Sequence, residues 1–468
     1  MKRMLRIIAP ILALVLCLVP FAACGGGGTA PAPDGGTAPA ADGSTPVPAE
    51  SSDGAAAAGG TLNIWSFTDE VPRMIERYKA DNPDFNYDFN FTIINTEDGA
   101  YQPALDQALA GGGSDAPDFF CAESAFVIKY TQGDASQFAA PYTDLGIDVA
   151  AGISAAQIAT YAHEIGTRGD GAIVGLPYQA TGGAYIYRRS IAQDVWGTDD
   201  PAAVKNHIGP GWDKFMEAAA ELGAKGYAAV SGDGDLWQVI RSNAQQGWIV
   251  NDKLNIDPGY EIFLDISKTF LENGWHNDTR DWQDPWFADM SGSGPKPVLG
   301  FFGPAWLINY VMSGNVGDTF GDWAVCEPPT GFSWGGTWLI ANKDSAHKEA
   351  VGRFFEWVTL DTSDDGLQYK WANGTLEGPG GTKDTVASAV VMGRSDGTVE
   401  LLGGQNMFDV FAPAGASASG STWTQYDETI NIAWRDQVRM YSSGQKDKEA
   451  ALNDFKTRVN DELGIAID

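Results

Sequence analysis

The sequence contains few of the residues on which metal and nucleophile chemistry usually depends. Among 468 residues there are only four histidines and four cysteines, and no Gly-Lys-Ser/Thr phosphate-binding loop occurs. His163 and Glu164 begin like a zinc-protease motif, but Thr167 occupies the position where the second histidine is required. The composition therefore favours a binding protein over an enzyme, and we predict no cofactor and no metal ion.

Basic residues are also scarce. Lys and Arg number 30 against 61 Asp and Glu, which gives a formal net charge of −31. So acidic a chain repels phosphate backbones, which excludes nucleic acid as a partner. The hydrophobic fraction of 44% nevertheless suits a globular protein. The length exceeds the about 250–300 residues at which a single core stops growing, so we expect two lobes or domains.

No apolar run is long enough for an ordinary membrane-spanning helix. Residues 7–21 are apolar but shorter than the about 20 residues that a span needs, and three basic residues precede them. We interpret residues 1–23 as a lipoprotein signal peptide, because Phe21-Ala22-Ala23-Cys24 resembles a bacterial lipobox. The resemblance implies lipidation of Cys24 and anchoring at the extracellular face of the cell membrane. Since Leu is usual at the position of Phe21, an ordinary cleaved signal stays open as the alternative.

Residues 24–60 follow as a second low-complexity segment. After Cys24 they consist almost entirely of Gly, Ala, Pro, Ser, Thr and acidic residues, without an aromatic side chain. Such a composition buries too little apolar area to offset ordering entropy, which predicts a flexible tether. In the body of the chain only Cys121 and Cys326 remain, and we expect two isolated buried thiols rather than a disulfide.

Strand and helix patterns alternate from residue 61 onward. Residues 61–65 alternate as in a strand, and Val71, Met74, Ile75 and Tyr78 have the spacing of an amphipathic helix. Strand patterns at 89–94 and 117–122 follow, with a helical pattern at 101–110 between them. This order predicts an α/β fold in which ligands bind at the carboxyl ends of the strands.

Motifs of one known family occur in the family's order at residues 61–69, 115–119, 173–188, 211–215, 302–306, 335–355 and 426–463. Gly211-Trp212-Asp213-Lys214-Phe215, for example, is similar to a TWDEF motif of that family. Together these segments resemble the extracellular solute-binding proteins of ABC importers, specifically the carbohydrate-binding, maltose-binding-protein-like group of family 1. A departure is the insert at 273–297, which is unusually rich in Trp and Gly.

The resemblance implies a two-lobed, periplasmic-binding-protein-like α/β fold with a hinge and a ligand cleft between the lobes. Lobe one would hold residues 61–178 and 336–378, and lobe two residues 179–335 and 379–468. Hinge crossings would lie near 179–184, 334–338 and 376–383. The implied partners are an oligosaccharide and the transmembrane subunits of an ABC permease, and we expect a monomer.

Sugars present apolar C–H faces and hydroxyl groups, which indole rings and carboxylate or amide groups complement. We therefore expect strand ends, hinge positions and loop edges to supply the ligand-binding residues. The predicted aromatic residues are Trp65, Tyr178, Trp237, Trp306, Trp334 and Trp423. The predicted hydrogen-bonding residues are Asp69, Glu123, Ser124 and Gln179. A helix cap is an equally good explanation of Asp69, and the helical patterns around Trp371 and Trp434 predict core positions.

The sequence predicts a lipid-anchored receptor that captures an oligosaccharide between its lobes and presents it to a permease. A surface glycoside hydrolase using Glu123 or Asp69 stays open, because acidic pairs are inevitable in such a chain. A receptor for another solute, such as a peptide or polyamine, is a further alternative. The acidic residues Asp233, Asp235 and those at 278–289 suggest a solvated acidic face more than a calcium site, since the full loop spacing is missing.

Overall fold

The computed structural model describes residues 59–96, 99–378, 380–416 and 420–467. The proposed signal peptide, Cys24 and nearly all of the tether lie outside these residues. No helix in the described part of the chain combines the length and apolarity needed to cross a bilayer.

The first sheet has five strands in the order β2-β1-β3-β12-β4. Its strands are β1 (Thr61–Ser66), β2 (Asp88–Ile93), β3 (Phe119–Glu123), β4 (Gly175–Pro177) and β12 (Thr337–Ala341). Strand β1 runs parallel to β2 and β3, whereas β12 is antiparallel to β3 and β4. The strands predicted near the N-terminus are confirmed, and their parallel order brings three carboxyl ends to one edge.

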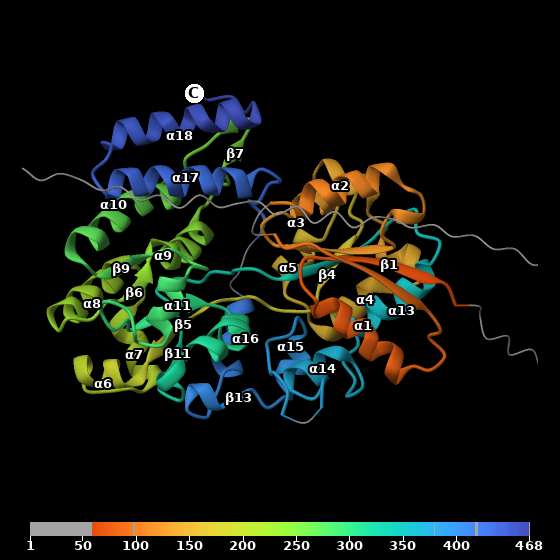
Figure 1. Ribbon diagram of the computed structural model, residues 1–468, viewed down its shortest axis with the longest axis horizontal. Helices are drawn as coiled ribbons and strands as arrows, with labels where there is room; N and C mark the ends of the chain where they lie inside the picture. The colour runs from red at the N-terminus through yellow and green to blue at the C-terminus, as the bar shows by residue number, and fades with distance from the viewer. Residues whose placement is uncertain (1–58, 97–98, 379, 417–419, 468) are drawn as a thin grey trace, which may run out of the picture. The chain divides into compact units, whose positions relative to one another are not determined.

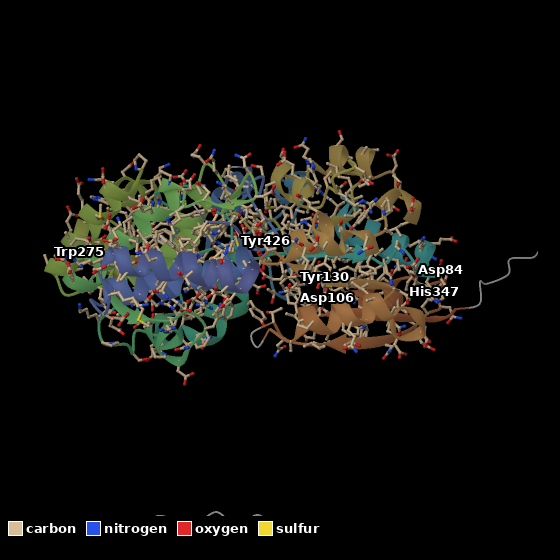
Figure 2. The ribbon with its side chains drawn as sticks, turned by 90° about the horizontal axis from the view of Figure 1, so that it is seen from above. Asp84, Asp106, Tyr130, Trp275, His347 and Tyr426 are labelled. Carbon is tan, nitrogen blue, oxygen red and sulfur yellow. The ribbon has the colours of Figure 1, made fainter. Side chains whose placement is uncertain are left out.

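Helices cover this sheet with the faces that the sequence predicts. In α1 (Glu70–Asp81) the stripe Val71, Met74, Ile75 and Tyr78 is buried. Tyr130 of α3 donates its hydroxyl to Asp106 of α2 (2.9 Å), which ties two of these helices together (Figure 2). The other helices of this region are α2 (Tyr101–Gly111), α3 (Val127–Thr131), α4 (Val149–Ala156), α5 (Thr160–Ile165), α13 (Lys348–Thr359), α14 (Leu367–Ala372) and α15 (Ala389–Met392).

The second region is built on a three-stranded antiparallel sheet in the order β10-β5-β11. Its strands are β5 (Ala184–Arg188), β10 (Gly300–Gly303) and β11 (Trp323–Cys326), and β6 (Val230–Gly232) pairs in parallel with β9 (His276–Thr279). Short strand pairs are β7 (Ile249–Val250) with β8 (Lys253–Leu254), and β13 (Thr398–Val399) with β14 (Gln405–Asn406). A ring cluster of Tyr185, Phe215 and Phe302 fills the core behind β5.

The helices of the second region include the two predicted near the C-terminus. They are α17 (Asp427–Ser442) and α18 (Lys448–Leu463), which lie side by side and pack near α10 (Pro258–Asn273) (Figure 1). Ile430, Trp434, Phe455 and Val459 are buried as expected. The remaining helices are α6 (Arg189–Trp196), α7 (Pro201–Ile208), α8 (Trp212–Ala224), α9 (Asp233–Ile240), α11 (Asp284–Met290), α12 (Ser313–Asn315) and α16 (Phe408–Ala416).

Three chain segments run next to one another between the two sheets. Gly183 N donates to Phe332 O (2.9 Å), and Trp334 N donates to Thr181 O (3.1 Å), so the first two segments pair antiparallel. A Cβ on Gly183 would lie 2.0 Å from the Phe332 ring, which explains why this position is glycine. The third segment joins through Thr385, whose hydroxyl donates to the Ala180 carbonyl (2.7 Å).

Two expectations about charged and sulfur-containing residues have different outcomes. Cys121 and Cys326 are free, buried thiols, as predicted. The solvated acidic face, in contrast, is wrong for Asp233, Asp235 and Asp289, which are 6%, 3% and 1% exposed. Asp278 and Asp284 are exposed as expected.

Arginines of α17 reach Asp233 and its neighbour Asp281. Arg439 binds Asp233 through two hydrogen bonds of 2.8 and 2.7 Å, and Arg435 pairs with Asp281. We call these four residues the arginine-paired cluster. Arginine side chains therefore pair with Asp233 and Asp281, whereas the sequence suggested that these carboxylates contact water or calcium.

Candidate functional site

A cavity of about 740 Å³ opens at the edge of the five-stranded sheet. Loops that follow β1, β2 and β3 form one wall, and residues that precede β12 continue it. Trp282, Trp306 and Tyr310 of the second region form another part of the wall. The volume is within the range of about 300–1,000 Å³ that is typical of small-ligand sites.

Three indole rings form an aromatic cluster in this cavity. Trp282 and Trp306 are stacked, with ring centroids 6.0 Å apart and an interplanar angle of 9°. Trp334 stands edge-on to Trp306 at 4.8 Å, and its carbonyl accepts a hydrogen bond from Trp306 Nε1 (2.9 Å). The structure thus brings the predicted residues Trp306 and Trp334 together, with orientations fixed by their mutual contact.

Trp282 is an aromatic member that the sequence did not single out. It lies between β9 and α11, in the Trp-rich insert that departs from the family pattern, and 41% of its surface is exposed. Its φ of 67° is unusual for a bulky side chain and costs on the order of 1–2 kcal/mol. Exposure and backbone strain distinguish Trp282 from the core tryptophans. In the sequence, the high Trp content of the insert at 273–297 was the feature that could have pointed to it.

Two carboxyl groups, Glu70 and Asp384, face the cavity without a cationic partner in hydrogen-bond contact, and we call them the cavity carboxyl pair. Glu70, in the first turn of α1, is half-buried and accepts a hydrogen bond from the Tyr178 hydroxyl. Asp384 is 3% exposed and accepts from Thr385 N (2.6 Å). Burial raises the pKa of Glu70, and burial and the charge of Glu70 raise the pKa of Asp384 to about 8. Sequence reasoning missed both residues.

Tyr178 itself, a predicted ligand-binding residue, is fully buried. Its ring packs edge-on to Trp371 (6.3 Å) and its hydroxyl is engaged by Glu70. The structure therefore places Tyr178 behind the wall of the cavity, where it orients Glu70, because its fully buried ring leaves no surface for a ligand.

Predicted polar residues line the cavity at the strand ends. Glu123 is the last residue of β3, and its carboxylate accepts from Ser124 Oγ (2.8 Å) and Ala125 N (3.2 Å). Burial raises the pKa of Glu123, although these hydrogen bonds oppose the shift. Gln179 also lines the cavity, with 6% of its surface exposed.

Asp69 lines the cavity too and belongs to an exposed ion-pair group. Its carboxylate lies 3.4 Å from Arg73 Nε, and Arg73 Nη1 lies 2.6 Å from Glu377. Asp69 occupies the N-cap position of α1, but its side chain accepts no capping hydrogen bond. The side-chain cap that competed with a ligand role for Asp69 is therefore absent from the structure.

A second, much smaller pocket adjoins the first near Glu123. Ser124 and Trp423, both predicted, line it together with Arg241 and Asp427. The Arg241 guanidinium lies 6.0 Å from the Trp423 ring, and its buried Nε has no hydrogen-bond partner. Ser124 and Trp423 are thus neighbours of the main cavity and do not line it.

Two predicted aromatic residues and one expected core residue need correction. Trp237 is 2% exposed and packs on Phe263 (5.0 Å), because every residue of the short helix α9 is buried. Trp65 is half-buried in β1 and packs against the core instead of the cavity. Trp371 is 7% exposed, as expected of a core residue, yet it also lines the cavity, and its buried Nε1 has no partner.

Solved structures share this fold at low sequence identity. A structure described as an extracellular solute-binding protein family 1 has a TM-score of 0.69 and 18% identity, covering 86% of this chain and 99% of the other. The galacto-N-biose/lacto-N-biose I-binding protein of the ABC transporter from Bifidobacterium longum has a TM-score of 0.63 and 16% identity, covering 87% and 98%. The sugar-binding protein MalE from Xanthomonas citri has a TM-score of 0.65 and 14% identity, covering 86% and 97%.

No curated protein sequence matches this chain. A family model does match it, over residues 64–364, and its description is bacterial extracellular solute-binding protein. The two-lobed α/β fold predicted from the motifs is confirmed by the structural matches. On this evidence the chain belongs to the family of bacterial extracellular solute-binding proteins.

Proposed function

We propose that this protein captures an oligosaccharide in the 740 Å³ cavity and delivers it to an ABC permease. The observation that carries the proposal is the pairing of indole faces with oxygen acceptors in one cavity. Trp282 and Trp306 offer flat apolar surfaces, while Glu123 and Gln179 offer groups that exchange hydrogen bonds with hydroxyls. Pyranose rings have the complementary combination of C–H faces and hydroxyl edges.

The ligand named for a protein of the same fold supports a saccharide. The Bifidobacterium longum relative is described in complex with lacto-N-biose. We extend the saccharide class to this chain, and not that particular sugar, because identity is only 16%.

The proposed lobes keep the division expected from the sequence, with one adjustment. Lobe one would hold residues 61–178 and 336–378, and lobe two the rest of the body. Ser388 donates to Gln368 of α14 (2.7 Å) and to Ala156 of α4 (2.8 Å), which favours extending lobe one to the end of α15. The cavity would then lie between lobes, and a ligand that contacts both would favour the closed form by its differential affinity.

Anchoring and delivery complete the proposal. Lipidation of Cys24, followed by a tether to residue 60, would hold the body at the extracellular face of the membrane near the permease. A micromolar ligand makes about −8 kcal/mol available, from which the cost of closing is subtracted.

A saccharide panel tests the proposed function. Purified protein is incubated with neutral, N-acetylated and amine-bearing oligosaccharides, and both melting temperature and released reducing ends are measured. We expect a melting shift with at least one saccharide and no new reducing ends. Released monosaccharide would instead establish the glycoside hydrolase alternative, and absence of any shift across the panel would reject a saccharide ligand.

The variant Trp306→Ala sharpens this test. Removing one indole face should weaken binding about tenfold or more, because aromatic stacking and burial contribute on the order of 1–3 kcal/mol. The matched control is Trp196→Ala, since Trp196 stacks on His207 outside the cavity. Equal affinity of the two variants would contradict the assignment of the cavity.

A further inference from the structure

The described residues that line the cavity carry an unbalanced set of charges. Five are acidic, and Arg73 is the one basic residue among them. Arg73 is already paired with Glu377 (2.6 Å) and Asp69 (3.4 Å). The carboxyl groups that lack a basic partner within ion-pair distance are Glu70, Glu123 and Asp384.

Neutral groups supply the hydrogen bonds of the cavity carboxyl pair. Glu70 accepts from the Tyr178 hydroxyl, and Asp384 accepts from Thr385 N (2.6 Å) and Thr385 Oγ1 (3.2 Å). The other titratable groups that act on Glu70 are Arg73, Asp69, Glu377 and the buried thiol of Cys121. Only one of these is a cation, and it is paired with Asp69 and Glu377, so the chain supplies no basic partner for the pair when both carboxyls are ionised.

Trp371 gives an independent indication of a ligand at the same place. It packs against Tyr178, the partner of Glu70, and lines the cavity. Although only 7% of Trp371 is exposed, its Nε1 has no hydrogen-bond partner. An indole N–H can only donate, so it requires an oxygen acceptor that the described protein residues do not provide.

We propose that Glu70 and Asp384 form a subsite for a protonated amine, so that the ligand is an oligosaccharide carrying a free amino group. This inference rests on the proposed function for the saccharide part of the ligand. A hydroxyl group could satisfy the hydrogen bonds of these carboxyls, but a cation also compensates their negative charge once both are ionised. A hydroxyl or ring oxygen next to the amine satisfies Trp371, and the indole faces of Trp282 and Trp306 add attraction for a cation. A polyamine offers no such oxygen.

Binding of an amine has a proton signature at this subsite. Because burial and Glu70 raise the pKa of Asp384 to about 8, this carboxyl holds a proton at pH 7 in the free protein. An ammonium group favours the ionised form, so the proton leaves to the buffer when the amine binds. A neutral saccharide gives no such release.

Calorimetry tests the subsite with four probes: a β-1,4-linked glucosamine trisaccharide, its fully N-acetylated counterpart, cellotriose and spermidine. At pH 7 we expect the amine-bearing trisaccharide to bind at least about tenfold more tightly than the N-acetylated one. Titrations in two buffers of different ionisation enthalpy should show a net release of less than one proton per ligand, because the fraction of the amine that is neutral at pH 7 takes up part of the proton that Asp384 loses.

The variants Asp384→Asn and Glu70→Gln should abolish the preference for the amine, and Asp384→Asn should also abolish proton release. The matched control is Asp235→Asn, because burial likewise raises the pKa of Asp235 to about 8, but Asp235 does not line the cavity. That control should keep both the preference and the proton release. Melting curves confirm that each variant is folded before its affinity is compared.

The outcomes separate this inference from the proposed function. Cellotriose or the N-acetylated sugar binding as tightly as the amine would overturn the amine subsite and leave a saccharide receptor. A preference that persists in both carboxyl variants would overturn it as well. Binding of spermidine with no saccharide binding would support the amine subsite and overturn the saccharide as ligand.

Discussion

Asp281 of the arginine-paired cluster and Asp384 of the cavity carboxyl pair have pKa values that are shifted in opposite directions. In the cluster, burial alone would raise the pKa of Asp281, but the charge and hydrogen bond of Arg435 outweigh it and lower that pKa. In the cavity, burial raises the pKa of Asp384 to about 8, and the nearby negative charge of Glu70 adds to the increase. The same residue type is thus compensated within the chain at one place and left uncompensated at the other.

The difference separates a structural use of charge from a binding use. Arg435 and Arg439 extend from α17 to the β6–α9 and β9–α11 segments, so their ion pairs join α17 to the rest of the second region. The cavity carboxyl pair forms no ion pair that joins two elements. Burying its carboxyl groups without a cation destabilises the free protein, and a bound ligand can offset that free energy. A buried acid without a cation marks the site only where it also lines the cavity, because Asp235 is buried without an ion pair elsewhere.

The largest expected effect comes from breaking the cluster. Arg439→Met leaves Asp233 without its bidentate partner, and we expect a loss of about 3 kcal/mol in the free energy of unfolding, measured by denaturant titration. The control Arg394→Met removes an exposed pair with Asp364 and should cost less than about 1 kcal/mol. Similar losses in both variants would show that the cluster is not a structural fastening.

A smaller effect of opposite sign is expected in the cavity, where Asp384→Asn should stabilise the protein in a pH-dependent way. The folded-state pKa of Asp384 is about 8, well above its ordinary value, so the carboxyl costs nothing below pH ~4. The cost grows as pH rises toward 8 and is constant above. The stability gain of the variant should therefore be near zero at pH 4 and on the order of 3 kcal/mol at pH 6, about two pH units above the ordinary pKa of Asp. A gain independent of pH would contradict the raised pKa.

The smallest expected effect on stability concerns Trp282, the strained residue in the wall of the same cavity. Trp282→Gly should be about 1 kcal/mol more stable than Trp282→Ala, because both variants lose the ring and glycine alone tolerates a φ of 67°. The same variant should bind a saccharide about tenfold more weakly, since a stacked face is lost. Trp282→Ala separates the two effects, because it loses the ring but keeps the strain. Unchanged affinity in both variants would remove Trp282 from the site.

Local patterns made much of the first region predictable. The stripe of α1 is correct because every fourth or third apolar residue meets the same sheet, and β1 follows from simple alternation. Trp306 and Trp334 were predictable as cavity residues because both flank segments where strands end. Trp237 is also a tryptophan near a segment boundary, but it lies in a helix of eight residues that is buried on all sides. The periodicity of so short a segment cannot show that every face of the helix is buried.

The charged part of the site was not predictable, because it depends on contacts between distant segments. Glu70 looks like an ordinary acid in the first turn of a helix, which the helix dipole alone would explain. Asp384 lies more than three hundred residues later, in the loop between α14 and α15, and reaches the cavity only because the third segment joins the first at Ala180. Trp371 is buried, as its helical pattern predicts, and it also lines the cavity.

The paired segments joined at Gly183–Phe332 and Trp334–Thr181 constrain how the molecule can flex. Two hydrogen-bonded strands resist sliding past each other, whereas bending out of their common plane leaves the bonds intact. We therefore expect opening and closing to follow essentially a single rotational coordinate. In the proposed function, the angle between the lobes would then depend on whether ligand is bound, and a permease would recognise the bound form from that angle alone.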